Sequence, residues 1–268
     1  MKNCVPALKF LCLLLGLNLI SCASVPTELL SKKPDDPVVA SLKIDGLYNL
    51  PPSERLPVVA VYKGGFTDLT GQRKSNSEFA LFSTAVSQGG EAYLIRALKH
   101  AADGKFFKVV ERVGIDHITR ERQIIRSTRK DFKEDSKLQP LLFAGLVMGG
   151  GIISYDSNIR TGGTGARYLG IGASQQYRED LVVVSLRTIS VSTGEVLIEV
   201  LVTKKLLSVG LSTDLFRFYE MGTELIELEI GATVNESMSV ALQKAVEAAV
   251  LETITEGEEK GFWSFSEG

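Results

Sequence analysis

The chain has 268 residues, of which 44% are hydrophobic and 23% charged, and its formal net charge is −2. This length suits one large domain, or one domain with a substantial insertion. The near-balanced charge gives no reason to expect nucleic acid or an anionic membrane surface as a partner.

The N-terminus has the pattern of a bacterial lipoprotein signal. Lys2 supplies a positive charge, residues 10–20 form a Leu-rich stretch of secretory-signal length, and Leu19-Ile20-Ser21-Cys22 ends it. The stretch is shorter than the roughly 20 residues of a membrane-spanning helix. Cleavage before Cys22 leaves its thiol to carry diacylglycerol and its amine to carry another acyl chain, and several chains anchor stably. Residue 23 is Ala rather than Asp, so nothing argues for retention at an inner membrane. The alternative is an ordinary secretory signal that ends in Ser-Cys.

Cysteine and histidine usage excludes several chemistries. Cys4 and Cys12 lie inside the signal, which leaves Cys22 as the one thiol of the mature chain. A disulfide framework and a thiolate metal site are therefore not expected. His100 and His117 lie in helix-like stretches beside charged residues, as solvated side chains do, so metal catalysis by a histidine cluster is excluded. We expect no cofactor other than the acyl chains on Cys22.

Residues 1–21 form the expected signal, and the segment after it leads into an α/β body. Residues 22–56 contain Pro, Ser and scattered charge and are interpreted as a lipidated tether. The first part of the body is expected over 57–152. It opens with a β-branched strand at 56–62, followed at about 63–82 by a loop without apolar periodicity. A loop of that length in a compact domain is usually functional.

Helix and strand signals then alternate. Ser83-Thr84 predicts the cap of a helix that ends at Asp103-Gly104. Residues 106–110 predict a strand, and residues 114–126 predict an amphipathic surface helix. This alternation indicates helices packed on a sheet.

From residue 141 onward the pattern predicts β-structure with two hairpins. Period-two alternation on both sides of a glycine-rich turn at 162–165 predicts the first hairpin, over 153–180. Each limb is close to the roughly 9–11 residues of a membrane-spanning strand, and its two different faces suit a barrel wall. Body strands are expected over 181–205. A second hairpin is expected over 206–231, although its alternation falters at Glu220 and Glu224.

The C-terminal part, 232–268, is expected to complete the body. Asn235 or Ser237 predicts the cap of a helix that ends near Glu256-Gly257. The apolar run Phe262-Trp263-Ser264-Phe265 is expected to dock on the body.

Several motifs together resemble the curli secretion channel lipoproteins, the CsgG family. They are Thr70-Gly71-Gln72, Phe82-Ser83-Thr84-Ala85-Val86, Glu121-Arg122-Gln123-Ile124-Ile125-Arg126, Tyr155-Asp156-Ser157-Asn158, the glycine-rich stretch 162–173, residues 191–196 and residues 209–218. The resemblance covers nearly all of residues 57–263, and the glycine-rich stretch is its most specific part.

The resemblance implies an α+β fold, with an α/β periplasmic domain and two transmembrane β-hairpins that join a large oligomeric β-barrel. About nine subunits would build a barrel of roughly 36 strands, the size of the largest known. It also implies an outer-membrane lipoprotein, lipid-anchored on the periplasmic side. The expected function is a nucleotide-independent diffusion pore that exports unfolded polypeptide, such as curli-type amyloid subunits, to the cell surface. The implied partners are further copies, those substrates, a periplasmic cap, surface-side accessory factors and outer-membrane lipid, with no nucleic acid.

The resemblance further implies a channel constriction within residues 73–82. Phe82 matches the family's Phe before Ser-Thr-Ala-Val, and Leu81 occupies the family's Asn position. The family's Tyr position falls near Asn76, and Phe79 is the candidate replacement for the missing aromatic ring. The alternative is that Phe79 and Phe82 pack the start of the helix onto the sheet.

The sequence also bears on other classes of function. Gly162-Gly163-Thr164-Gly165 lacks the Lys and the following helix of a P-loop, so it does not indicate nucleotide binding. An enzyme is not expected, because no Ser/His/Asp spacing stands out and the adjacent Asp116 and His117 would not face each other on a helix. The remaining alternative is a non-pore envelope-assembly or adaptor lipoprotein of the periplasm, whose hairpins pair with a partner.

Overall fold

The computed structural model describes residues 36–37, 39, 41–71, 88–168, 171–217, 226–235 and 238–266. For the strand residues 157–168, 171–178, 207–217 and 226–235 it describes the backbone alone. The chain divides into residues 1–41 and a unit of residues 42–268, and the helices and strands named below all lie in the second.

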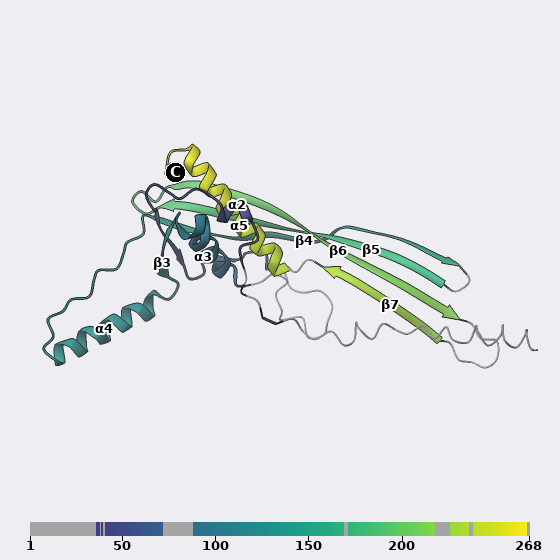
Figure 1. Ribbon diagram of the computed structural model, residues 1–268, viewed down its shortest axis with the longest axis horizontal. Helices are drawn as coiled ribbons and strands as arrows, with labels where there is room; N and C mark the ends of the chain where they lie inside the picture. The colour runs from purple at the N-terminus through teal and green to yellow at the C-terminus, as the bar shows by residue number, and fades with distance from the viewer. Residues whose placement is uncertain are drawn as a thin grey trace, which may run out of the picture. The chain divides into compact units, whose positions relative to one another are not determined.

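A seven-stranded sheet organises the unit of residues 42–268 (Figure 1). Its strands are β1 (Val58–Tyr62), β2 (Phe66–Asp68), β3 (Lys108–Arg112), β4 (Leu146–Tyr168), β5 (Ile171–Ser190), β6 (Val196–Arg217) and β7 (Ile226–Asn235). The strand order is β3-β1-β4-β5-β6-β7, with β2 paired to β4 on the same edge as β1. β1 is parallel to β3 and β4, and β2 is parallel to β4. From β4 to β7 the pairing is antiparallel, so the α/β part continues directly into a meander.

Three helices form the core together with this sheet. α5 (Met238–Glu259) packs on β5 and β6, α3 (Gly90–His100) packs on β1, β2 and β3, and α2 (Asp45–Tyr48) contacts both helices. The fully buried apolar side chains come from both layers and include Leu94, Leu98, Val246, Val250, Ile254, Val59, Val182, Val184 and Leu186. Each such burial contributes about 1.5–3 kcal/mol. On the buried face of α5, the small residues Ala241, Ala245 and Ala249 recur every four residues.

α4 (Ile115–Asp131) differs from the other helices, because none of its residues is buried. The sequence predicted this surface helix over 114–126, and it continues for a further turn to Asp131. The strand predicted at 106–110 begins only at Lys108, because Phe106 and Phe107 are fully buried in the core instead of extending the ladder. Their rings pack edge to face with a centroid separation of 4.7 Å.

β4, β5 and β6 run beyond the helices and form a four-stranded ribbon with β7 (Figure 1). β4 has 23 residues and β5 has 20, so the same strands serve the body and the ribbon. The expected hairpin 153–180 therefore continues along β5 into the expected body strands, 181–205. These body strands continue along β6 into the second expected hairpin, 206–231. Register shifts in β4, between Ile152 and Ser154 and again between Asp156 and Arg160, mark where the body passes into the ribbon.

The glycine-rich turn predicted at 162–165 is wrong. These residues lie inside β4 and pair with residues 174–177 of β5, and the pairing continues to Tyr168 and Ile171. Glycine often marks a turn because it tolerates unusual backbone angles, yet it adopts extended angles equally well. Here the ladder on either side holds these glycines in the strand.

Both ends of the unit pack on the body. Residues 42–56, which the sequence analysis placed in the tether, include the buried Leu47 of α2 and Ser53, which bridges to Phe265. At the other end Trp263 is 8% exposed, and its Nε1 donates a hydrogen bond to the Ile254 carbonyl at 2.8 Å. The predicted docking of the run 262–265 is confirmed.

Candidate functional site

The site residues predicted from the sequence lie outside the described residues. These are the lipidation candidate Cys22 and the constriction candidates Asn76, Phe79, Leu81 and Phe82. The structure does describe the two ends of the predicted constriction loop, which are residues up to Gly71 on one side and residues from Gln88 on the other. We call these two ends, together with Asp68, which contacts both of them, the loop base.

Asp68, the last residue of β2, connects the two sides of the loop base. Its Oδ1 accepts hydrogen bonds from the Thr70 backbone N–H at 2.9 Å and from Thr70 Oγ1 at 2.7 Å. Its Oδ2 accepts a hydrogen bond from Gln88 Nε2 at 3.2 Å, across 20 residues of sequence. One carboxylate therefore fixes where the chain leaves the body and where it returns. The sequence analysis missed Asp68, although an Asp that ends a strand before a long polar loop is a recognisable signal.

The start of α3 packs tightly against the same strand. A Cβ at Gly90 would lie 2.6 Å from a ring carbon of Phe66, which is a fully buried core residue, so only glycine fits at this position. One residue later, Glu91 Oε2 accepts the Gly64 backbone N–H at 2.9 Å. The loop base is thus built on the rigid core.

A second polar group lies where β4 and β5 leave the body. Tyr155 OH donates to Asp180 Oδ2 at 3.2 Å, and both residues are buried. Beside them, Lys205 of β6 forms a 3.0 Å ion pair with Glu179 of β5. Buried polar groups are retained where they are hydrogen-bonded, and such pairs fix one arrangement of neighbouring strands. The root of the ribbon is therefore held in a defined register.

The ribbon has two edges without a partner strand in the described part of the chain. β1 and β2 cover the outer edge of β4 only as far as Ile152. At the other side of the ribbon β7 pairs with β6 alone. An open edge presents a row of unpaired N–H and C=O groups to another strand. The chain can therefore accept a further strand on each side.

Two other features are absent from the part of the chain that the structure describes. No helix among the described residues combines the length and apolar character needed to cross a membrane. Within the same residues, no group of three or more His, Cys, Asp and Glu side chains is arranged to hold a metal ion.

Comparisons with known proteins define the class. Residues 41–268 match the family described as "Curli production assembly/transport component CsgG". A relative of that description from Salmonella typhimurium (strain LT2) is 38% identical over 259 residues, which cover 95% of this chain and 90% of the relative. Its counterpart from Escherichia coli (strain K12) is 37% identical over 256 residues, covering 94% of this chain and 89% of that protein.

A structural comparison matches a dodecamer of a PelC variant from Paraburkholderia phytofirmans at a TM-score of 0.26 and 11% identity, over 77% of this chain and 91% of that one. A likeness at this level carries no argument about fold or assembly.

The sequence matches place the protein among transport components, a class without enzymatic activity. The chain belongs to the CsgG family of curli production assembly/transport components. The family resemblance stated from the sequence motifs is thereby confirmed.

Proposed function

We propose that copies of this chain join side by side into a ring, and that their ribbons close one β-barrel in the outer membrane. The barrel acts as a nucleotide-independent diffusion pore through which unfolded polypeptide leaves the periplasm. Acyl chains on Cys22 anchor each copy on the periplasmic side.

The observation that carries this proposal is the pair of open ribbon edges. β4 and β6 run away from the body, whereas β5 and β7 return to it. If β7 of one copy lies beside β4 of the next, the two strands run in opposite directions and extend the same antiparallel meander. Repetition of this pairing closes the sheet, and closure is what lets β-structure exist in lipid, where unpaired backbone groups are costly.

The ribbon has the length that a membrane wall requires. β7 has 10 residues, and β4 continues beyond its last contact with β2 from Ile153 to Tyr168. A tilted strand needs roughly 9–11 residues to cross the hydrocarbon layer. With four strands per copy, about nine copies give the roughly 36 strands of the largest known barrels.

The names of the relatives support the proposed substrate class, and the lack of a phosphate-binding motif in the sequence supports transport without nucleotide hydrolysis. The relatives are named for curli production and transport, so amyloid-forming curli-type subunits are the proposed cargo. The glycines at 162–165, the nearest approach to a phosphate-binding motif, lie within β4 and lead to β5 rather than to a helix. Movement therefore depends on diffusion, on capture of the cargo at the cell surface and on confinement by a periplasmic cap.

The constriction is proposed to come from the loop that leaves the loop base. Phe82, Phe79, Leu81 and Asn76 are its candidate lining residues by family resemblance, and Asp68 holds the loop ends. A ring of such side chains grips an extended chain weakly and excludes folded proteins. Replacing Phe82 by Ala is expected to widen conduction without affecting assembly of the ring, and unchanged conduction and secretion would contradict this assignment.

The proposal is tested by expressing the full chain with its signal, purifying it in detergent and inserting it into planar bilayers. We expect detergent-stable rings with a steady conductance. In cells, deletion should remove the exported subunits from the surface. The alternative, a periplasmic adaptor lipoprotein that forms no pore, would be favoured if the purified protein were a monomer without conductance and if deletion left export intact.

A further inference from the structure

We propose that α4 of one copy docks on the acidic end of α5 in the next copy. The acidic end consists of Glu252, Glu256, Glu258 and Glu259, which occupy the last two turns of α5. The inference rests on the proposed ring and assigns the contact between the bodies of adjacent subunits.

α4 is part of a preformed arm. Three arginines each donate a hydrogen bond to a backbone carbonyl of the segment that returns from α4 to β4. Arg129 binds the Ser136 carbonyl at 2.8 Å, Arg122 binds the Gln139 carbonyl at 2.6 Å, and Arg112 binds the Leu142 carbonyl at 2.6 Å. The accepting carbonyls recur every three residues, so the returning segment lies extended along the helix. This ladder fixes the arm without burying it.

The arm presents an exposed basic face. Thr119, Gln123, Arg126 and Lys130 follow one another at helical spacings of four, three and four residues, so they share one face of α4. All four side chains are exposed, and Arg126 and Lys130 also line a cavity with two further cations, Arg129 and Lys137, and with two carboxylates of the returning segment, Glu134 and Asp135. The four cations of this cavity outnumber its two carboxylates, so the surface suits an anionic partner.

The acidic end of α5 has the opposite character. Negative charge at a helix C-terminus adds to the negative end of the helix dipole and is unfavourable for the isolated helix. α5 nevertheless has no basic residue in its last turn, and Glu252, Glu258 and Glu259 are exposed. Lys260 pairs with Glu256. Cations from a neighbouring copy would offset this accumulation of charge.

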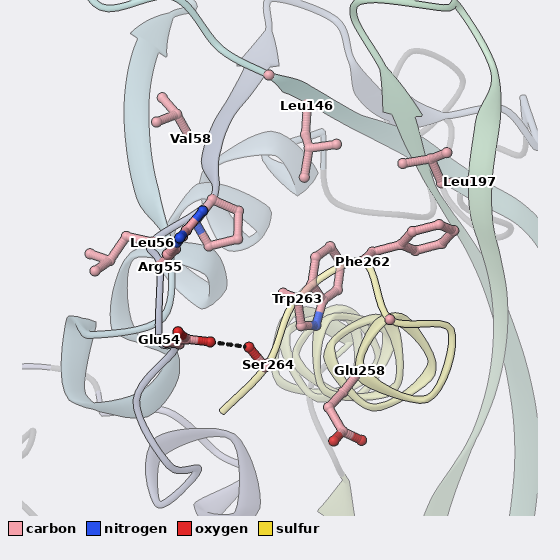
Figure 2. Close-up of a pocket in the computed structure, with 13 residues that line it drawn as sticks. Glu54, Arg55, Leu56, Val58, Leu146, Leu197, Glu258, Phe262, Trp263 and Ser264 are labelled. Carbon is pink, nitrogen blue, oxygen red and sulfur yellow. Dashed lines mark hydrogen bonds between the residues drawn. The ribbon is translucent and has the colours of Figure 1, made fainter. Parts of the chain in front are cut away.

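A groove of mixed polarity adjoins the acidic end; Glu54, Arg55 and Ser264 are among its polar lining residues. It has a volume of about 720 Å³, and Leu146, Leu197, Phe262 and Glu258 are among its lining residues (Figure 2). Phe262 is 43% exposed there. At the far end of α4, Phe132 is 81% exposed and provides an aromatic side chain that could fill such a groove. Each of the two charged surfaces therefore carries one exposed aromatic side chain, and aromatic residues are enriched in protein interfaces.

Strand order brings these surfaces together. Within the body, β3 is one edge of the sheet, and α4 follows it directly (Figure 1). The other edge of the body is β6, on which α5 packs, because β7 pairs only with the ribbon part of β6. Copies joined from β7 to β4 therefore place the α5 side of one body beside the α4 side of the next. The contact joins two different surfaces of the chain, and repeated head-to-tail contacts of this kind generate rings.

Charge exchange tests the contact in the full acylated chain. Arg126→Glu with Lys130→Glu should shift the purified protein from rings to smaller species, and Glu252→Lys with Glu259→Lys should do the same. All four substitutions in one chain restore opposite charges at every contact and should restore rings. Unchanged emission of Trp263 would show that each variant is folded.

Cross-linking provides the second measurement, because the mature chain is expected to have no thiol other than the acylated Cys22. Arg126→Cys combined with Glu259→Cys should give a ladder of covalent multimers with a short bismaleimide, and either substitution alone should give none. If rings survive both charge reversals and no cross-linked ladder forms, the contact between α4 and α5 is refuted, whereas the proposed pore is not. A wild-type monomer would overturn both.

Discussion

The buried carboxylate of Glu247 in α5 accepts the backbone N–H of Lys43 at 2.6 Å. The next N–H along the chain, that of Ile44, donates to the same oxygen at 2.9 Å. Gln243 Nε2 donates to the other oxygen at 2.6 Å. Glu247 is only 1% exposed, so these donors take the place of water around its carboxyl group. These hydrogen bonds tie Lys43 and Ile44, which immediately precede α2, to the core of the body.

Glu247→Gln should lower the free energy of unfolding by about 1–3 kcal/mol, because the single amide oxygen can still accept from the two backbone N–H groups but the new NH2 group meets the Gln243 Nε2 donor instead of accepting from it. Denaturant titration of the purified protein measures this change. The N-terminal segment should also become more sensitive to limited proteolysis near Lys43. Glu195→Gln, at an exposed residue outside the proposed contact between copies, is the matched control, and an equal effect of the two substitutions would refute the role of Glu247.

Gly257→Ala should displace the C-terminal segment. A Cβ at this position would lie between 2.0 and 2.6 Å from three ring carbons of Trp263, which is the only tryptophan of the chain. Overpacking of this kind typically costs about 1–3 kcal/mol. The emission of Trp263 should shift to longer wavelength as the ring becomes solvated. Gly145→Ala, where an added Cβ meets nothing within 4 Å, should leave emission unchanged, and a Gly257 variant with native emission would contradict the packing.

The contact between Tyr48 and Asp103 should depend on pH at both extremes. The hydrogen bond from Tyr48, and then Lys105, lower the pKa of the Asp103 carboxyl below its usual 3.8, while the same hydrogen bond raises the pKa of Tyr48 above 10.0. A lowered carboxyl pKa stabilises the fold above the unfolded value, and this contribution is lost as the pH falls through the folded pKa. The raised phenol pKa has the reverse sign, so its contribution is lost as the pH rises through the folded value.

Hydrogen exchange of α2 measures this dependence. Protection should be constant between the two transitions and fall at each extreme by a small amount, because both groups are exposed. Tyr48→Phe removes the hydrogen bond and should abolish the alkaline transition and weaken the acid one, because Lys105 still lowers the pKa of Asp103, while Leu47 stays in the core. Identical profiles for the variant and the wild type would show that the contact contributes nothing.

Asp68→Ala should loosen the loop base and leave assembly unaffected. The substitution removes the acceptor shared by Thr70 and Gln88, so the two ends of the candidate constriction loop lose their connection. In planar bilayers the conductance should become larger and noisier than that of the wild type. Glu195→Ala, at an exposed residue of the β5–β6 connection, is the control. A ring with wild-type conductance would show that Asp68 does not position the constriction.

Local patterns in the sequence predicted the body well. Helical spacing of apolar residues predicted α3, α4 and α5, and β-branched runs predicted β1 and the body part of β5. The docking of the 262–265 run also followed from its apolar character. These features depend on short-range periodicity and burial, which a single sequence displays directly.

Features that depend on pairing across the sheet were harder to predict. The glycines at 162–165 suggested a turn, yet the register with residues 174–177 keeps them extended. Phe106 and Phe107 resembled strand residues, but both rings are buried in the core. Glu247 was missed because the backbone N–H groups that it binds lie 203 and 204 residues away in sequence. Hydrogen bonds over such separations leave no local pattern in the chain.

The central claim is that ribbons from many copies close a single membrane-spanning wall. The most direct test determines the mass and symmetry of the detergent-purified acylated protein and, on the same preparation, measures hydrogen exchange of residues 153–231. The account predicts a closed ring in which these residues are strongly protected. A lone subunit whose residues 153–231 exchange freely with water would contradict it.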